Sequence, residues 1–468
     1  MHWTFFVVRQ YEAEIAGKDG QFKCRRSQAL KWVFLAILIF SIWPASAWLR
    51  RNPDKLRWPC FLIGFLPFVT YRFHLLAAPI SWVWVGYTKG LEIHVLDTVA
   101  IVILITLRGG IVRLSFIVPM ALYFLSALSA TFWALSPEAA AFYCWQLLRV
   151  FTVYLAVANV CALEFEAAAS ILKGLATGEI LECGVAIWQR FGQHILQTSG
   201  TMDSQNELGI ASHFVLFPFF ALMLGGRRGW LPPLVVFACL ATDALTTSRG
   251  AVVLGLTGLG LVWLFSSLTR ISVRKFSVAL LGLTAVALMT PLAIASFDKR
   301  FGHSNLGLGE DPERLAFKRA ASMMIADHPW GVGPNNFAFV ANVRGYYNHL
   351  GISNNGRSSN VHNLYVLTLA EVGPAGLASY ILILVVPFIT AMRYGLRPVY
   401  QDADDPRRDI LIGASVTLLI VAIHSTEEWV MVVAVLEYLL AILLGFVSGL
   451  SIKERTSAVT PAISSKGS

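Results

Sequence analysis

The stretch NVHNLYVLTLAEVGPAGLASYILILVVPFITA, residues 360–391, decides the fold class of this chain. After a polar start it stays apolar for about the 20 residues that a helix needs to cross a hydrocarbon core. Lipid gives backbone amides no hydrogen-bond partner outside their own helix, so such a segment crosses the bilayer as a helix. The sequence therefore predicts a membrane-spanning helix over about 363–391, with the titratable ring of His362 at its mouth.

The composition extends this conclusion to the whole chain. Of 468 residues, 56% are hydrophobic and 14% are charged, with a mean hydropathy of +0.63, whereas soluble domains carry roughly 25% charged residues. Apolar runs long enough to span a membrane recur along nearly the entire sequence. These features exclude a water-soluble fold and predict an all-α protein, a polytopic transmembrane helical bundle.

Short basic loops set the expected orientation of the spans. The net charge of +9 lies largely in such loops, which indicates membrane orientation and not nucleic acid as a partner. The loops at 107–113, 225–230 and 269–275 fall on the side of the C-terminal tail, which is predicted to be cytoplasmic. We expect about 12 spans, within a range of about 11 to 13. Residues 50–92 resist this scheme, because the basic RRNPDKLR follows only one span.

The predicted topology divides the chain into five segments. They are a cytoplasmic N-terminal segment (1–29), N-terminal transmembrane helices (30–296), one large external loop (297–362), C-terminal transmembrane helices (363–451) and a cytoplasmic tail expected to be disordered (452–468). The first thirty residues mix acidic and basic side chains before any long apolar run, which is not the pattern of a cleaved signal peptide.

The loop at 297–362 is the one large extramembrane segment of this scheme. Its basic residues do not contradict an external location, because long loops translocate largely regardless of charge. Pro312 to Asp327 has the pattern of a short amphipathic helix, with Asp311 as its expected N-terminal cap. The helix is expected to stop at His328, and WGVGPNNF (330–337) then predicts a Gly- and Pro-rich loop.

Cysteine usage points to no metal or disulfide chemistry. The cysteines stand singly, most of them in apolar segments, without a C-x-x-C pair, so neither a metal site nor a disulfide framework is predicted. They are Cys24, Cys60, Cys144, Cys161, Cys183 and Cys239.

Four motifs in a fixed order carry a resemblance to a known family. They are SQNELGIA (204–211), SRG (248–250), DHPWGVGPNNF (327–337) and VHNLYVLTLAEVGPAGL (361–377), with an Arg-led amphipathic helix between the second and the third. In this order they resemble the bacterial O-antigen ligase and O-antigen polymerase family over roughly residues 200–390. The N-terminal third of the chain is supported by its hydropathy alone.

The resemblance implies a membrane-embedded glycosyltransferase that works without a metal ion or another cofactor. Its donor would be a glycan linked to undecaprenyl pyrophosphate, presented on the periplasmic face of the bacterial inner membrane, so that the large loop is periplasmic. The acceptor hydroxyl would belong to lipid A core, to another lipid-linked glycan or to a protein. Surrounding membrane lipid is the other implied partner.

The family's functional residues carry over to Arg249 of SRG, Arg314 of the loop helix and His362 of VHN. Asn206 stands at the start of an earlier span, where the family often has an Asn. The chain departs from the family at Phe317, where such helices often continue with a Trp. This departure concerns packing.

Elementary chemistry gives these residue types suitable roles. A guanidinium group pairs with phosphate oxygens through a planar, permanently charged fork, so Arg249 and Arg314 are predicted to bind the donor pyrophosphate. A positioned histidine with an ordinary pKa near 6.5 can take or orient a hydroxyl proton, which makes His362 the predicted catalytic base. Asn363 is a candidate for shaping the acceptor site, although an interface role is equally compatible with its position.

Each of these predictions has a simpler alternative. Arg249 lies at a predicted membrane boundary, where an arginine can extend its charged group to the interface without a catalytic role. Arg314 is compatible with an ordinary exposed helix charge, and His362 with a residue that caps the helix. In the turn at 424–428, His424, Glu427 and Glu428 either face the same cavity or form a solvated turn.

Helical geometry excludes one attractive pairing. Glu371 lies nine residues after His362, which in a continuous helix places the two on opposite faces and about 13 Å apart along the axis. Glu371 is therefore predicted to contact loop groups or another helix, and Gly373-Pro374 is predicted to kink the span.

The sequence leaves two questions open: whether the protein is a glycosyltransferase or a transporter, and which of three acceptors a glycosyltransferase would use. A polytopic transporter is disfavoured because no internal repeat is visible, and its spans would be broken near mid-membrane. Within the family, a ligase, a polymerase and a protein O-oligosaccharyltransferase all need the same donor chemistry. The sequence favours the first two without separating them.

Overall fold

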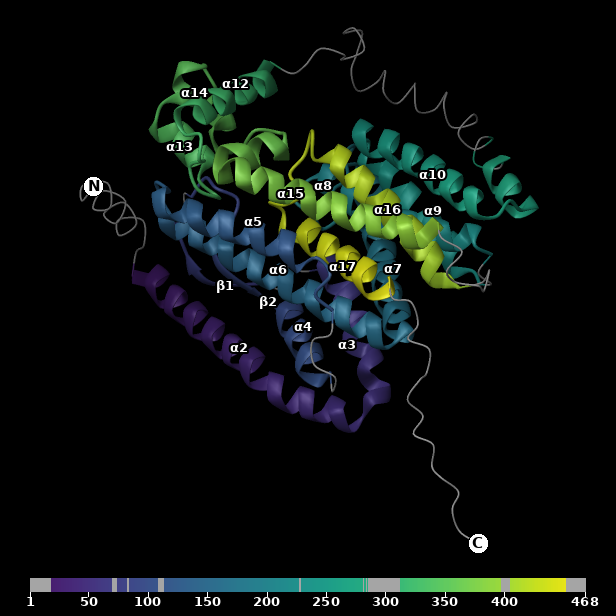
Figure 1. Ribbon diagram of the computed structural model, residues 1–468. Coiled ribbons are helices and arrows are strands. Elements are labelled where there is room, and N and C mark those ends of the chain that lie inside the picture. Colours follow the sequence, from purple (N-terminus) through teal and green to yellow (C-terminus); the bar gives the residue numbers. More distant parts are fainter. Residues whose placement is uncertain are drawn as a thin grey trace.

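The computed structural model describes residues 18–69, 74–81, 84–107, 113–226, 229–280, 312–396 and 405–451, together with 282 and 284. Long helices stack side by side in the body of the protein, and a cluster of short helices sits at one end (Figure 1). The long and medium helices are α2 (Lys18–Arg51), α3 (Arg57–Phe65), α4 (Val95–Thr106), α5 (Ile117–Ala130), α6 (Pro137–Leu163), α7 (Phe165–Ile187), α8 (Gln205–Leu224), α9 (Leu231–Thr246), α10 (Arg249–Thr269), α15 (Leu364–Leu396), α16 (Pro406–His424) and α17 (Ala434–Leu450).

The predicted class, a helical membrane protein, is confirmed. Among the described residues, five helices are long and apolar enough to cross a membrane, namely the Lys31–Arg51 part of α2 together with α6, α8, α10 and α15. Four shorter apolar helices accompany them. Predicted spans such as 206–224 and 249–267 coincide with α8 and α10. The span expected at 276–296 falls largely outside the described residues, and the total of about 12 spans stays a prediction.

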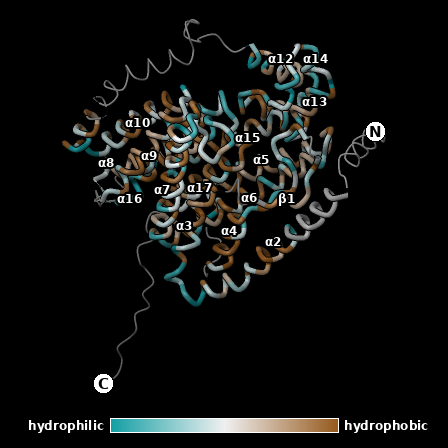
Figure 2. Tube along the Cα trace, turned by 180° about the vertical axis from the view of Figure 1, so that it is seen from behind, coloured by the Kyte–Doolittle hydropathy of each residue, from teal (hydrophilic) through white to brown (hydrophobic). Residues whose placement is uncertain are grey.

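Apolar side chains cover the outside of the helices as well as the inside. On α2, Phe40 is 76% exposed and Trp43 is 72% exposed. Figure 2 shows hydrophobic segments along the long helices and more hydrophilic ones at the α12–α14 end. Large exposed aromatic rings on a long helix are disfavoured in water but suited to lipid. The exposed apolar surface therefore agrees with a bilayer around the bundle.

Helix α8 forms the centre of one half of the bundle. Nearly every residue from Leu208 to Leu224 is buried, and the helix packs against α9, α10 and α16. In the other half, α6 packs along α17, and α15 lies between α5 and α16. The buried Ser212 and His213 of α8 pair with Asp243 of α9 and His424 of α16, which suits a helix that lies inside the bundle, away from lipid.

A short antiparallel hairpin was not predicted from sequence. Strands β1 (His74–Pro79) and β2 (Gly90–His94) pair between α3 and α4, with an irregularity in the register between Leu76 and Ala78. This part of the chain is the segment that resisted the topology scheme. Among its described residues the helices and strands are short, and Pro79 ends β1.

The predicted loop helix is present. α12 (Pro312–Asp327) has the expected bounds, and its apolar stripe of Phe317, Ala321 and Met324 is buried. Helices α13 (Phe337–Val343) and α14 (Tyr346–His349) and the 3-10 segment η7 (Asn354–Ser358) complete the cluster, which packs on α15. The expected cap Asp311 lies outside the described residues.

The predicted kink in α15 is confirmed and anchors the cluster. Gly373 has φ 77° and ψ −174° inside the helix, and Pro374 lacks an N–H to bond the carbonyl of Ala370. The freed carbonyls of Ala370 and Glu371 instead accept hydrogen bonds from the backbone N–H groups of Val332 (2.9 Å) and Gly333 (2.8 Å). The WGVGPNNF loop thus satisfies the backbone groups that the kink leaves open.

Replacing Gly331 with Ala is expected to destabilise this junction. Gly331 has φ +86°, and a Cβ there would lie 2.4 Å from the Glu371 carbonyl oxygen. The strained backbone alone costs about 1–3 kcal/mol, so Gly331→Ala should lower the melting temperature of the detergent-purified protein. Gly184→Ala is the matched control, because nothing lies within 4 Å of its added Cβ. Equal melting of the two variants would contradict this account of the junction.

Candidate active site

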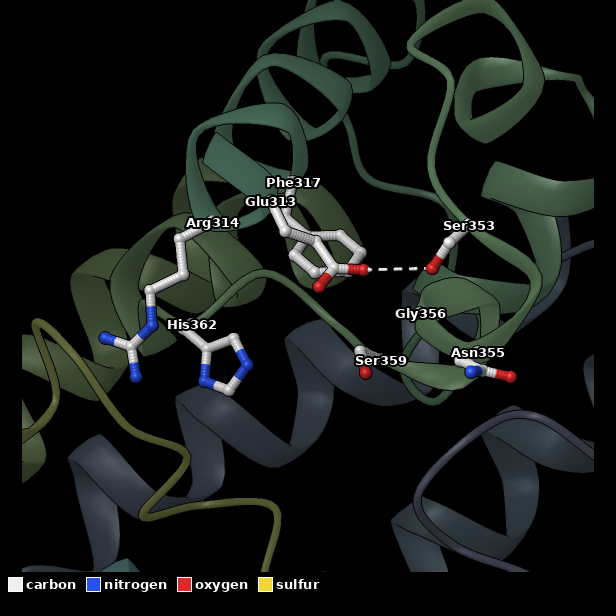
Figure 3. A pocket seen from close by; sticks show the side chains of 8 residues that line it. All are labelled: Glu313, Arg314, Phe317, Ser353, Asn355, Gly356, Ser359 and His362. Carbon is white, nitrogen blue, oxygen red and sulfur yellow. Dashed lines mark hydrogen bonds between the residues drawn. The ribbon is translucent and has the colours of Figure 1, made fainter. Parts of the chain in front are cut away.

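A pocket of about 510 Å³ opens between α12, η7 and the start of α15. In Figure 3, Arg314 and His362 lie side by side at one end, and Ser353, Ser359 and Asn355 lie at the other. The lining residues are Glu313, Arg314, Phe317, Ser353, Asn355, Gly356, Ser359 and His362. The structure therefore brings two of the sequence-predicted site residues into one cavity.

Arg314 forms ion pairs with the turn between α16 and α17. Its Nη1 lies 3.0 Å from Glu427 Oε2, and its Nη2 lies 3.8 Å from Glu428 Oε1. The Arg314 side chain is 34% exposed, so its charge remains accessible from the pocket. The two contacts join α12 to this turn.

Asn206 reaches the same turn from α8. Its Nδ2 donates a hydrogen bond to Glu428 Oε1 at 2.6 Å. Glu428 therefore joins Asn206 and Arg314, two residues that sequence reasoning placed in the site without a common partner. No pattern in the sequence pointed to this link, because the three residues lie on elements far apart along the chain.

The carboxyl group of Glu428 has a perturbed pKa. Burial raises this pKa to about 7, and the negative charge of Glu427 acts in the same direction. Arg314 and the Asn206 hydrogen bond oppose the shift. At neutral pH the group therefore lies close to its titration midpoint, which suits a site where charge and protons are exchanged.

His362 is held by an aromatic stack. Its ring lies 4.3 Å from the Trp429 ring, centroid to centroid, at an interplanar angle of 25°. Trp429 is fixed in turn, because its Nε1 donates to the carbonyl of Val361 at 2.8 Å. The ring of Phe317 lies 6.4 Å from His362. The departure from the family pattern at Phe317 thus lies in the packing around the histidine.

Asn363 acts as a helix cap. Its Oδ1 accepts a hydrogen bond from the Val366 N–H at 3.0 Å, at the first turn of α15. Next to it, the Leu364 N–H donates to the Ser425 carbonyl, and the Tyr365 hydroxyl donates to the Ala422 carbonyl, both at 2.8 Å. These contacts fix the start of α15 against the end of α16, and they favour the interface role of Asn363.

Arg249 lies outside the pocket of Figure 3. It is exposed at the start of α10, where the Ser248 hydroxyl caps the helix by accepting from the Ala251 N–H. Ala251 packs closely against Gly209, one turn after Asn206 on α8. The start of α10 therefore packs closely on α8, and the Arg249 side chain is not among the residues that line the pocket.

Glu371 contacts loop groups, as the helical geometry predicted. Its buried carboxylate accepts hydrogen bonds from the Tyr87 hydroxyl (2.7 Å) and from the backbone N–H groups of Asn336 (3.0 Å) and Phe337 (2.8 Å). It therefore holds the start of α13 and the segment before β2 on α15. Its role is to position the loop cluster.

Two residues that sequence reasoning missed complete this junction. Asn335 exchanges side-chain hydrogen bonds with the backbone N–H (3.0 Å) and carbonyl (2.8 Å) of Thr88. Asn336 does the same with Ser136, at 2.8 Å to the N–H and 3.1 Å to the carbonyl. The available signal was the adjacent pair of asparagines in a Gly- and Pro-rich loop, a setting in which amides commonly bond backbone groups.

His424 lies inside the bundle, and its ring does not line the cavity. Its Nε2 is 3.0 Å from His213 Nδ1, and His213 Nε2 is 3.3 Å from Asp243 Oδ2. The His424 carbonyl accepts hydrogen bonds from the N–H groups of Glu427 and Glu428. The reading of His424 as a cavity residue is wrong for its ring, while its backbone supports the glutamate turn.

One comparison with known proteins identifies the central part of the chain. Residues 234–381 match the family model described as O-Antigen ligase. This part of the chain is similar to the O-antigen ligase family. The match confirms the predicted resemblance, and it covers Arg249, Arg314 and His362. No curated protein matches the chain.

The raised pKa of Glu428 predicts a pH-dependent contribution to stability. The carboxyl pKa is about 7 in the folded protein against an ordinary value of 4.5, so between these values the folded state holds a proton that the unfolded state has lost. The unfolding free energy contributed by Glu428 should therefore fall as pH rises from about 4.5 to about 7. Melting curves of wild type and Glu428→Gln across this range measure the difference.

The exposed Glu138, in the first turn of α6, supplies the control. Glu138→Gln should follow the wild-type pH profile throughout. A constant offset between wild type and Glu428→Gln from pH 4.5 to 7 would contradict the assigned titration.

Proposed function

We propose that this protein transfers a glycan from undecaprenyl pyrophosphate to an acceptor hydroxyl at the periplasmic face of the inner membrane. The similarity to the O-antigen ligase family supports membrane glycan transfer in polysaccharide biosynthesis. The main support for this donor and this reaction is the pocket that Arg314 and His362 line together. A cation and a titratable ring in one cavity match a pyrophosphate leaving group and a hydroxyl nucleophile.

In the proposed reaction the acceptor oxygen attacks the anomeric carbon of the donor sugar. The bond from this carbon to the pyrophosphate oxygen breaks, and its electron pair leaves with the pyrophosphate. The acceptor proton passes to His362, whose ring plane is set by Trp429. Arg314 stabilises the negative charge that develops on the leaving group.

For the donor to bind Arg314, its pyrophosphate has to displace the carboxylates that already form ion pairs with this side chain. Pyrophosphate oxygens compete with Glu427 and Glu428 for the same guanidinium group. Protonation of Glu428 weakens its hold on Arg314, and its pKa of about 7 places this change near neutral pH. Asn206 then retains the turn through its hydrogen bond to Glu428.

Arg249 is proposed as a second donor contact. Arg249 is exposed at the start of α10, an apolar helix long enough to cross a membrane. This position agrees with contact to a phosphate at the membrane surface. Asn363 is proposed to shape the acceptor side through its cap of α15. The acceptor is proposed to be lipid A core or a second lipid-linked glycan, with a protein hydroxyl as the third alternative.

Substitution of the three charged residues tests their roles. His362→Ala should lower the transfer rate at least about 100-fold, the usual size of a general-base contribution. Arg249→Ala and Arg314→Ala should lower it by a similar factor, since each removes charge stabilisation. The measurement is glycan transfer by purified protein in liposomes that contain the lipid-linked donor.

The chain offers matched controls for these variants. His349 and Arg319 are exposed, and neither lines the pocket. His349→Ala and Arg319→Ala should transfer at the wild-type rate. Normal transfer by a correctly folded His362→Ala, Arg249→Ala or Arg314→Ala would remove that residue from the proposed mechanism.

A product assay separates the acceptors. Purified protein is incubated with a lipid-linked repeat unit alone, and then with lipid A core or a candidate acceptor protein. A ladder from the donor alone identifies a polymerase, and transfer that requires lipid A core identifies a ligase. Transfer only to protein identifies an O-oligosaccharyltransferase, and no new glycosidic bond in any mixture would contradict the proposed function.

A further inference from the structure

The pocket of Figure 3 has two chemically different ends. Arg314 and His362 form one end, and the hydroxyls of Ser353 and Ser359 with the amide of Asn355 lie toward the other. The carboxylate of Glu313 extends toward this second end. The proposed reaction involves Arg314 and His362 at the first end. It gives no function to the residues at the second end.

The exposed Glu313 carboxylate lies against η7. Its Oε1 accepts a long hydrogen bond of 3.5 Å from the Ser353 hydroxyl. The same oxygen would lie 2.2 Å from a Cβ added at Gly356, a buried residue of η7. A side chain at Gly356 would therefore force the flexible end of Glu313 to shift.

We propose that Glu313, Ser353, Asn355 and Ser359 form a subsite for an uncharged sugar ring, and that Glu313 excludes sugars that carry a carboxylate. This inference rests on the proposed function and names the substrate class of the same pocket. The sugar concerned is the one attached to the pyrophosphate, because the subsite lies in the cavity that also contains Arg314.

The side chains match the chemistry of a sugar ring. Carboxylate, amide and hydroxyl groups accept and donate hydrogen bonds to ring hydroxyls, while the buried ring of Phe317 offers an apolar surface in the same pocket. The volume of about 510 Å³ lies within the range of about 300–1,000 Å³ typical of small-molecule sites. The second end is therefore suited to a polyhydroxylated ligand.

The charges also give the donor one orientation. Glu313 and Arg314 are consecutive on α12, so the pocket carries a negative and a positive group at neighbouring positions. A pyrophosphate is attracted to Arg314 and repelled by Glu313, which directs the sugar toward the hydroxyl-lined end. A uronic acid at that end would meet a like charge, and such a contact is an effective means of rejecting a wrong ligand.

Donor preference tests the subsite. Two lipid-linked disaccharides are compared, one with a neutral hexose and one with a uronic acid as the ring attached to the pyrophosphate. Wild type should prefer the neutral donor. Glu313→Gln removes the charge with little change of shape and should raise the ratio of acidic to neutral transfer on the order of tenfold, equivalent to about 1.4 kcal/mol.

Two further variants separate charge from general damage. Gly356→Ala keeps the carboxylate but should displace it from its position, so it should also raise the ratio. Glu138→Gln removes an exposed glutamate that does not line the pocket, and should keep the wild-type ratio. Circular dichroism and gel filtration confirm that each variant is folded.

The outcomes distinguish this inference from the proposed function. If wild type forms glycosidic bonds but uses both donors equally, or if Glu313→Gln keeps the wild-type ratio, the subsite is overturned and the proposed function stands. Equilibrium binding of the two donors to the protein in nanodiscs is measured alongside. A binding preference that depends on Glu313, without any bond formation, would support the subsite and contradict the proposed function.

Discussion

Two carbonyl groups of α15, those of Ala370 and Glu371, lose their helical partners at Gly373-Pro374 and are bonded by the N–H groups of Val332 and Gly333. In a low-dielectric setting an unbonded carbonyl is costly, so the kink and the loop stabilise each other. The Glu371 side chain adds bonds to the start of α13. The loop cluster, and with it the wall of the pocket that α12 supplies, is therefore positioned by a defect in a membrane helix.

The turn between α16 and α17 is the second feature that positions the pocket residues, after the kink in α15. Glu428 accepts a hydrogen bond from Asn206 of α8 and forms an ion pair with Arg314 of α12. The Trp429 ring stacks on the ring of His362. One short turn thus contacts both functional groups of the proposed mechanism. A change in its position would alter the charge on one side of the pocket and the histidine on the other.

The sequence was informative wherever a local rule determines structure. Hydropathy located α8, α10 and α15 closely, because the length of an apolar run follows from bilayer thickness. Helical phase separated Glu371 from His362, and Gly373-Pro374 identified the kink. The hairpin β1–β2 was missed because its strands are short and β1 (HLLAAP) has no clear alternation of apolar and polar residues.

Contacts between distant segments were beyond such rules. Asn206 and Arg314 were predicted from family motifs, but their shared partner Glu428 depends on how three elements pack. The stack of His362 on Trp429 depends on the same packing. Arg249 shows the converse, since its motif is clear while its side chain lies outside the pocket lining.

The ion pairs of Arg314 have a consequence for which anions the pocket retains. A cation already paired with Glu427, and with Glu428 when that group is ionised, attracts a free phosphate ion weakly, because the ion has to displace carboxylates that are part of the protein and present at high local concentration. A pyrophosphate on a lipid carrier is itself confined to the membrane surface and offers two phosphate groups at once. Under the proposed function, the two carboxylates would therefore select against small soluble anions and in favour of a donor held at the membrane surface.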